Sequence, residues 1–202
     1  MRMRSLAMVM LLCASATGIS SQQIDYTALW DGATPFDRFL ASVRARETQW
    51  KSRFANAAVD ADALTRVRAL KDRRRILAVA EDRCSDSAWA VPYIAKLAAA
   101  VPERLELRVI GRKEGGEVQS ANPTLDGRVV TPTIVILDES NRPVGAWVER
   151  PADLQAWVIA NKASLSSDEL HEKIDRWHAA DGGKSTLREI VALLEKSMTG
   201  GK

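Results

Sequence analysis

The sequence predicts an α/β fold in which a mixed central sheet is flanked by helices. Residues 76–80 form a continuous apolar run, which is typical of a strand buried on both faces. A helical segment at 87–99 and an alternating apolar–polar strand at 105–109 follow, so the three together make a strand–helix–strand unit. Two further strands, 133–137 and 143–148, are separated by a short polar turn and therefore predict an antiparallel hairpin.

The region before this unit is predicted to be helical. Thr34 and Pro35 are interpreted as an N-cap and the first helical position, and apolar residues at helical spacing extend this helix to about Asn56. A second helix is predicted from Asp60 to Leu70. Its end carries a basic run without interleaved aromatic residues, which favours a solvated helix end over a nucleic-acid patch. The run consists of Arg66, Arg68, Lys71, Arg73, Arg74 and Arg75.

Three helices are predicted after the hairpin. Pro151 opens the first, and two capping boxes start the others, Ser166 with Glu169 and Thr186 with Glu189. No element is predicted for the Gly-rich connection between the second and third strands. The predicted organisation is a signal peptide (1–21), an N-terminal helical extension (22–72), the α/β core (73–163) and C-terminal helices packed on the core (164–202).

Residues 1–21 have the pattern of a secretory signal peptide. Arg2 and Arg4 precede the apolar run 6–13, and Ala14-Ser15-Ala16 offers a cleavage site of small residues. The apolar run is too short for a transmembrane helix, which needs about 20 residues. An uncleaved anchor and a lipoprotein are the alternatives, and the lipoprotein lacks the small residue that must precede its cysteine. We therefore expect a protein secreted across the inner membrane into the periplasm, without stable membrane insertion after cleavage.

Cleavage changes the charge and the cysteine count. The formal charge falls from +3 to +1 because Arg2 and Arg4 leave, and Cys13 leaves with them. This small charge does not suggest a nucleic-acid partner. The mature chain would keep Cys84 alone, which cannot form an internal disulfide. Cys84 is then either a buried apolar filler or a functional thiol.

The loop between the first buried strand and its helix contains Cys84, at a place where ligands and reactive groups gather in open α/β sheets. The helix dipole and Arg83 favour a thiolate there, whereas Asp82 and Asp86 oppose it. These residues leave the direction of the net effect open. Ser87, three residues further, is placed to hydrogen-bond the sulfur.

These residues resemble the thioredoxin superfamily, which places a Cys-x-x-Cys motif at this strand–helix junction. Cys84 matches the first cysteine, and Ser87 stands at the position of the second. Pro92 matches the proline of the active-site helix, and Thr131-Pro132 resembles the cis-proline loop that faces the cysteine. The resemblance implies a thioredoxin-like fold for the predicted core.

More narrowly, the chain resembles a bacterial thioredoxin-like branch with a Trp-Cys-Gly-Asp motif. Residues 145–151, Gly-Ala-Trp-Val-Glu-Arg-Pro, and residues 181–186 look like further parts of that branch. The chain departs from the pattern at Arg83, where tryptophan is usual, and at Ser85, where glycine is usual.

The resemblance implies thiol–disulfide exchange with Cys84 as the nucleophile and with Ser87 and Asp86 tuning the sulfur. The missing second cysteine is the main departure, because a second thiol must attack the mixed disulfide to release the partner. A small thiol or another protein would have to complete the reaction. The sequence therefore leaves open whether the chain is an enzyme.

The same resemblance implies a partner site and an alternative function. Thr131 and Pro132 would clamp the backbone of a protein or small-molecule thiol or disulfide, with Arg83 and Trp89 beside it. No metal or organic cofactor is implied. The alternative is a non-catalytic protein-binding module that keeps the fold as a scaffold. His171 and His178, two turns apart on one helix without a third ligand, are interpreted as surface histidines.

Overall fold

The structure is a computed structural model that describes residues 23–196, so the predicted signal peptide lies outside the described residues. One mixed sheet has the strand order β1-β3-β2-β4-β5. Its strands are β1 (Thr34–Pro35), β2 (Arg74–Val79), β3 (Leu105–Ile110), β4 (Thr133–Leu137) and β5 (Pro143–Val148). β2 and β3 are parallel, and the other neighbouring strands are antiparallel. The predicted strand–helix–strand unit and hairpin are therefore confirmed.

The helices of the described residues are α1 (Tyr26–Gly32), α2 (Phe36–Ser42), α3 (Glu47–Asn56), α4 (Ala61–Arg68), α5 (Ser85–Ala100), α6 (Gly116–Ala121), α7 (Ala152–Asn161), α8 (Ser167–Asp181) and α9 (Lys184–Lys196). Within residues 23–196, none of them combines the length and the apolar character that crossing a bilayer requires.

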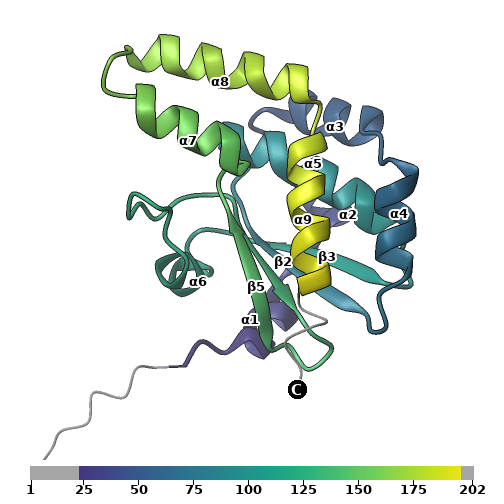
Figure 1. The fold of residues 1–202 in the computed structure, drawn as a ribbon. Coiled ribbons are helices and arrows are strands. Elements are labelled where there is room, and N and C mark those ends of the chain that lie inside the picture. The colour runs from purple at the N-terminus through teal and green to yellow at the C-terminus, as the bar shows by residue number, and fades with distance from the viewer. Residues whose placement is uncertain (1–22, 197–202) are drawn as a thin grey trace, which may run out of the picture.

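Helices cover both faces of the sheet (Figure 1). On one face α3, α4, α5 and α9 share a core with Ile76 and Ala78 of β2. On the other face α1 and α6 pack on Leu77 and Val79. Because successive side chains of a strand point to opposite faces, β2 contributes to both cores and consists of an unbroken apolar run after its first two residues.

The α7–α8 pair forms a separate layer. The two helices lie side by side above the sheet in Figure 1, with Leu154, Val158 and Ile174 buried between them. α9 then returns across α5 and β5. This arrangement brings α8 over the N-terminal half of α5, where the predicted site lies.

The single helix predicted over residues 34–56 is wrong. Thr34 and Pro35 pair with β3 instead of opening a helix, and two helices follow in place of one. The chain breaks at Arg46, whose φ of 53° lies in the left-handed region that a helix interior excludes. The backbone N–H groups of the two preceding residues bond to the Asp82 carboxylate, at 3.0 and 2.9 Å. A tertiary contact has therefore replaced helical hydrogen bonds.

The two predicted capping boxes have different outcomes. The box at Ser166 is confirmed, because its hydroxyl accepts from Glu169 N (3.3 Å) and the Glu169 carboxylate accepts from Ser166 N (3.0 Å). The second box is wrong, because α9 begins at Lys184 and Thr186 lies inside it. The Glu189 carboxylate accepts hydrogen bonds from β5 and from the start of α7 instead.

Neither α1 nor α6 is predicted from the sequence. They have only seven and six residues, and helices of that length depend on tertiary packing. Trp30 of α1 and Val118 of α6 are buried against the sheet and supply that packing. Their local patterns were too short to be distinguished from loops.

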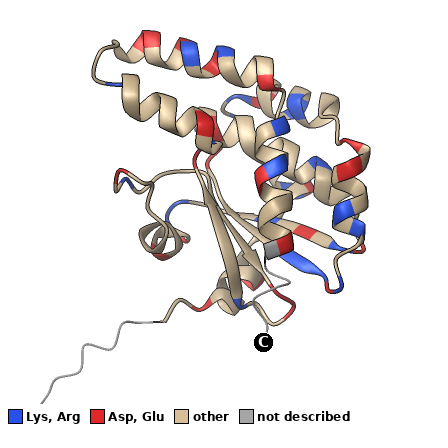
Figure 2. Cartoon of the chain, in the orientation of Figure 1, with Lys and Arg blue, Asp and Glu red and all other residues tan. Residues whose placement is uncertain are grey.

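The basic run before β2 makes contacts within the fold. In Figure 2 this run appears as blue segments at the end of α4 and at the start of β2. Arg66 binds the Glu195 carboxylate at 2.6 Å, Arg73 binds Glu106 at 3.1 Å, and Arg75 donates to Asn141 Oδ1 at 2.6 Å. These cations therefore tie α4 and β2 to neighbouring elements.

Candidate functional site

Cys84 is the N-cap residue of α5 and is half-buried. Its Sγ accepts a hydrogen bond from Ser87 N at 3.4 Å and donates one to Thr131 O at 3.2 Å. The extended backbone at Cys84 turns directly into the helix, as N-cap residues do. The sulfur therefore lies between the first turn of α5 and the loop that leads into β4.

That loop contains a cis peptide bond between Thr131 and Pro132. Both residues are buried, and Pro132 O accepts from Glu149 N at 2.8 Å, which joins the loop to the end of β5. Within residues 23–196 the backbone N–H of Thr131 has no hydrogen-bond partner. The loop thus has an unpaired backbone donor on the residue whose carbonyl accepts from the Cys84 sulfur.

The loop before Cys84 is held from the other side by the turn between α2 and α3. The Asp82 carboxylate accepts from the backbone N–H groups of Ala45 and Arg44, and these bonds lower the pKa of Asp82. Trp50 is fully buried and donates its Nε1–H to Asp82 O at 2.9 Å. The N-terminal helices therefore position the cysteine loop.

Asp86 points into an ion-pair network. Its carboxylate accepts two bonds from the Arg150 guanidinium, at 2.9 and 2.7 Å, and both side chains are about nine-tenths buried. Burial raises the pKa of Asp86, and Arg150 acts in the opposite direction. Arg150 also contacts Glu149 at 3.0 Å, and Glu149 binds Arg128 through both carboxylate oxygens. Alternating charges thus connect α5 to the cis-proline loop.

Trp89 lies one turn further along α5 and is half-buried. Its ring stacks on His178 with the centroids 5.2 Å apart, and the Arg53 guanidinium lies 3.2 Å from the Trp89 ring centroid. Trp89 Nε1 donates to Asp175 Oδ1 at 2.6 Å. The side chain therefore links α3, α5 and α8.

His178 is not the predicted surface histidine. It is only 3% exposed because α8 packs over α5, whereas His171 is exposed as expected. Burial lowers the pKa of His178 to about 4, with Arg150 acting in the same direction. The imidazole is therefore neutral at pH 7, so its 3.9 Å approach to Asp86 is not an ion pair. In the part of the chain that the structure describes, no group of three or more His, Cys, Asp or Glu side chains could hold a metal ion.

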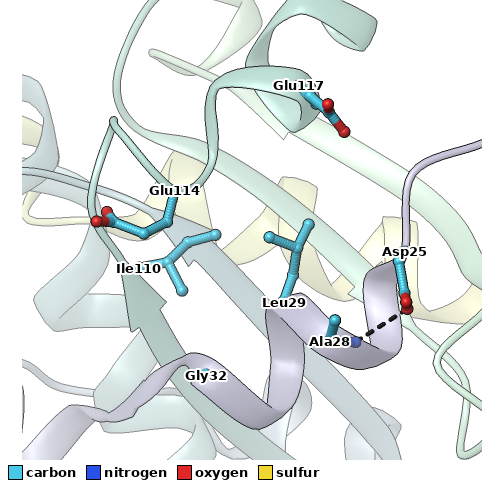
Figure 3. A pocket seen from close by; sticks show the side chains of 7 residues that line it. All are labelled: Asp25, Ala28, Leu29, Gly32, Ile110, Glu114 and Glu117. Carbon is cyan, nitrogen blue, oxygen red and sulfur yellow. Dashed lines mark hydrogen bonds between the residues drawn. The ribbon is translucent and has the colours of Figure 1, made fainter. Parts of the chain in front are cut away.

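A separate pocket of about 290 Å³ lies between α1, the end of β3 and the start of α6 with the turn before it (Figure 3). It is on the sheet face opposite α5, so the cysteine loop does not contribute to it. Asp25 at its edge is engaged as the N-cap of α1. Its lining residues are Asp25, Ala28, Leu29, Gly32, Ile110, Glu114 and Glu117. They come from distant segments, which explains why no local pattern predicted the pocket.

Some of the predicted site residues lie around the Cys84 sulfur, and others are turned toward different elements. Cys84, Ser87 and the Thr131–Pro132 pair lie together around the sulfur, and Arg83 is exposed beside them. Asp86 is turned toward Arg150, and Trp89 toward α8.

Sequence reasoning missed the roles of Arg150, Glu149 and His178. Arg150 and Glu149 belong to the stretch 145–151 that carries the family resemblance, which is the one signal that could have indicated them. The Ser87 hydroxyl is fully buried and makes no hydrogen bond within the described residues.

Comparisons with known proteins agree with the fold. The family model described as "Thioredoxin" matches residues 33–169, more than half of the chain. A solved structure of a protein of unknown function from Pseudomonas aeruginosa is 21% identical, with a TM-score of 0.65 over 86% of this chain and 98% of that one. An HIV epitope scaffold is 20% identical, with a TM-score of 0.65 over 85% of this chain and 98% of that one. No curated protein matches the chain. At these identities the solved structures show the fold alone, and the matching family model shows that the chain belongs to the thioredoxin family.

Proposed function

We propose that this chain is an exported, periplasmic thioredoxin-family protein that performs thiol–disulfide exchange through a single cysteine, Cys84. One observation carries the proposal. The Sγ of the half-buried Cys84 lies at the N-terminus of α5 and faces the cis-proline loop, 3.2 Å from Thr131 O. A partner segment whose backbone carbonyl accepts from the Thr131 N–H would hold its disulfide beside the sulfur.

The reaction is a thiolate attack on a disulfide. Cys84 loses its proton to solvent, its sulfur bonds to one partner sulfur, and the other partner sulfur leaves as a thiolate. Ser87 cannot attack the mixed disulfide because its side chain has no thiol. A second thiol, from a small molecule or a protein, must therefore attack the partner sulfur of the mixed disulfide; it forms a new disulfide with the partner, and Cys84 leaves as a thiolate.

Reactivity of Cys84 in the folded protein tests the proposal. The native protein should be alkylated by iodoacetamide and should form a mixed disulfide with an activated disulfide, and Cys84→Ser should do neither. A thiol that reacts only after denaturation would refute the proposal. Export is tested by the N-terminal sequence of the protein isolated from the periplasm, which should begin after the predicted signal peptide.

Replacing the missing thiol provides a matched control. The Ser87→Cys variant places a second cysteine in the same turn of α5, where Ser87 N already bonds the Cys84 sulfur at 3.4 Å. Without added reductant, we expect this variant to release the reduced partner and to form a disulfide between residues 84 and 87, whereas the native protein stops at the mixed disulfide. Equal release of the reduced partner by both proteins would contradict the monothiol mechanism.

The second candidate is a non-catalytic binding module. The serine at the position of the resolving cysteine and the commitment of Asp86 to Arg150 favour it. On this hypothesis a partner binds without a covalent bond, so the Cys84→Ser variant should keep the full affinity of the native protein for that partner.

A further inference from the structure

Arginine side chains flank Cys84 on two sides. Arg83 immediately precedes it and is exposed, and Arg46 lies beside the same loop because its Nε donates to Arg83 O at 2.8 Å. On the other side Arg112 donates to Val129 O at 3.2 Å, two residues before the carbonyl that accepts from the Cys84 sulfur. Three arginines from different segments therefore belong to, or hydrogen-bond, the two loops that meet at the thiol.

These three charges are not held in ion pairs within residues 23–196. None of the three arginines forms an ion pair with another described residue. The same loop carries two acids, Glu81 and Asp82, so the three arginines outnumber them by one. Asp82 accepts from backbone N–H groups and keeps its negative charge near Arg83. The approach to the sulfur thus carries a local excess of positive charge, which attracts anionic partners.

The loop before the cis peptide bond adds an apolar surface. Leu125 and Val129 are the large apolar side chains that stand out as exposed among residues 23–196, at 94% and 41%. Single exposed apolar residues are ordinary, but these two occur in one segment and lead directly to the unpaired N–H of Thr131. The segment can therefore contact an extended chain through both side chains and backbone.

We propose that the partner presents its reactive cysteine on an extended polypeptide segment in which acidic residues flank the cysteine and an apolar residue follows nearby. This inference rests on the thiol exchange proposed above. Carboxylates on either side of the cysteine would meet Arg83 and Arg112, whose guanidinium groups bind carboxylates in paired hydrogen bonds. A small anionic thiol would use the charges but leave Leu125 and Val129 uncovered.

The test uses three synthetic peptides that differ only in the residues flanking one cysteine, which are Asp, Asn or Lys. Each peptide cysteine is activated as a mixed disulfide with pyridine-2-thiol. The Cys84 thiolate attacks the peptide sulfur, the peptide–Cys84 disulfide forms, and pyridine-2-thione leaves and is measured by its absorbance. The rate at which Cys84 reacts with each peptide is divided by the rate at which a small neutral thiol reacts with the same peptide. This ratio removes differences in intrinsic reactivity between the peptides.

We expect the Asp peptide to react about tenfold faster than the Lys peptide at low salt, and the difference to shrink at high salt. The Arg83→Gln/Arg112→Gln variant should lose this preference. A matched variant, Arg38→Gln/Arg68→Gln, removes two exposed arginines that lie away from the site and should keep it. A preference that survives in the first variant would overturn the inference.

Two further outcomes separate this inference from the proposed function. If the native protein does not react with the neutral reagent 4,4′-dithiodipyridine, the thiol exchange itself fails. If it reacts but shows no preference among the peptides, only the acidic partner is refuted. A third outcome concerns a small anionic thiol, for which oxidised glutathione is the probe. If oxidised glutathione reacts as fast as the Asp peptide, and if Leu125→Ser does not slow the reaction with that peptide, the site binds a small anionic thiol. This result would overturn the inference of a polypeptide partner.

Discussion

Replacing the buried imidazole of His178 by a phenyl ring is expected to flatten the acid dependence of stability. The His178→Phe variant keeps an aromatic ring against Trp89 but removes the titrating group. In the folded protein burial lowers the pKa of His178 to about 4, whereas an unfolded histidine has a pKa of about 6.5. Between these values the unfolded state binds more protons, so this group makes the protein less stable as the pH falls from about 6.5 toward 4.

The magnitude follows from the two pKa values. Each pH unit between them is worth about 1.4 kcal/mol, so the full effect of His178 is roughly 3 kcal/mol. Most of it, about 2.5 kcal/mol, is expressed between pH 7.5 and pH 4.5. Below pH 4 both states are protonated and the contribution stops changing. The carboxyl of Asp86, whose pKa is raised by burial, changes stability in the opposite direction but is present in both proteins.

Urea denaturation of the native protein and of His178→Phe at pH 7.5, 6.0 and 4.5 measures the effect. Because all other groups titrate in both proteins, the difference between the two curves isolates His178. Over this pH range, the free energy of unfolding should fall by about 2–3 kcal/mol less in the variant than in the native protein. His171→Phe, on the exposed side of the same helix, should follow the native curve. Parallel curves for the native protein and His178→Phe would refute the assignment of a buried neutral imidazole.

Two stability predictions concern the surroundings of α5. Asp86→Asn should lower the free energy of unfolding by about 2–4 kcal/mol, because it removes one partner of a buried ion pair with Arg150; a loss below about 1 kcal/mol in urea denaturation would contradict this. Gly183→Ala should cost about 2–4 kcal/mol in the same assay, since its Cβ would lie 2.3 Å from the Tyr93 ring at a φ of +80°. Gly182→Ala, at a φ of +62° in open space, is the control and should cost only about 1 kcal/mol; equal losses would show that the contact with Tyr93 is unimportant.

Local patterns predicted most of the elements. The apolar runs of β2 and β4, the alternation in β3 and the capping box at Ser166 each depend on residues close together in the chain, and each is confirmed. The prediction failed where a distant segment decided the outcome. The helix over 34–56 is interrupted because the Asp82 carboxylate, far along the chain, binds the backbone that would have continued it.

Only part of the candidate site could be predicted, because some of its contacts are local and others join distant segments. Cys84 and Ser87 lie in one helical turn, so their relation could be derived from spacing alone. The direction of Asp86 could not, because its partner Arg150 is 64 residues away and approaches only when β5 ends beside α5. The burial of His178 likewise depends on α8 folding back over α5.

The sequence by itself determined the order of strands β2 to β5 and of most of the longer helices, the position of Cys84 at a strand–helix junction and the serine in place of a second cysteine. Apolar periodicity and residue identity are properties of the local chain, so they can be recognised before the chain is folded. Only the tertiary structure decided that Arg46 and Arg112 hydrogen-bond the loops on either side of Cys84, that Asp86 is paired with Arg150, and that His178 is buried and uncharged. Charge pairing and burial arise from contacts between distant segments, and these contacts exist only after the helices have packed on the sheet.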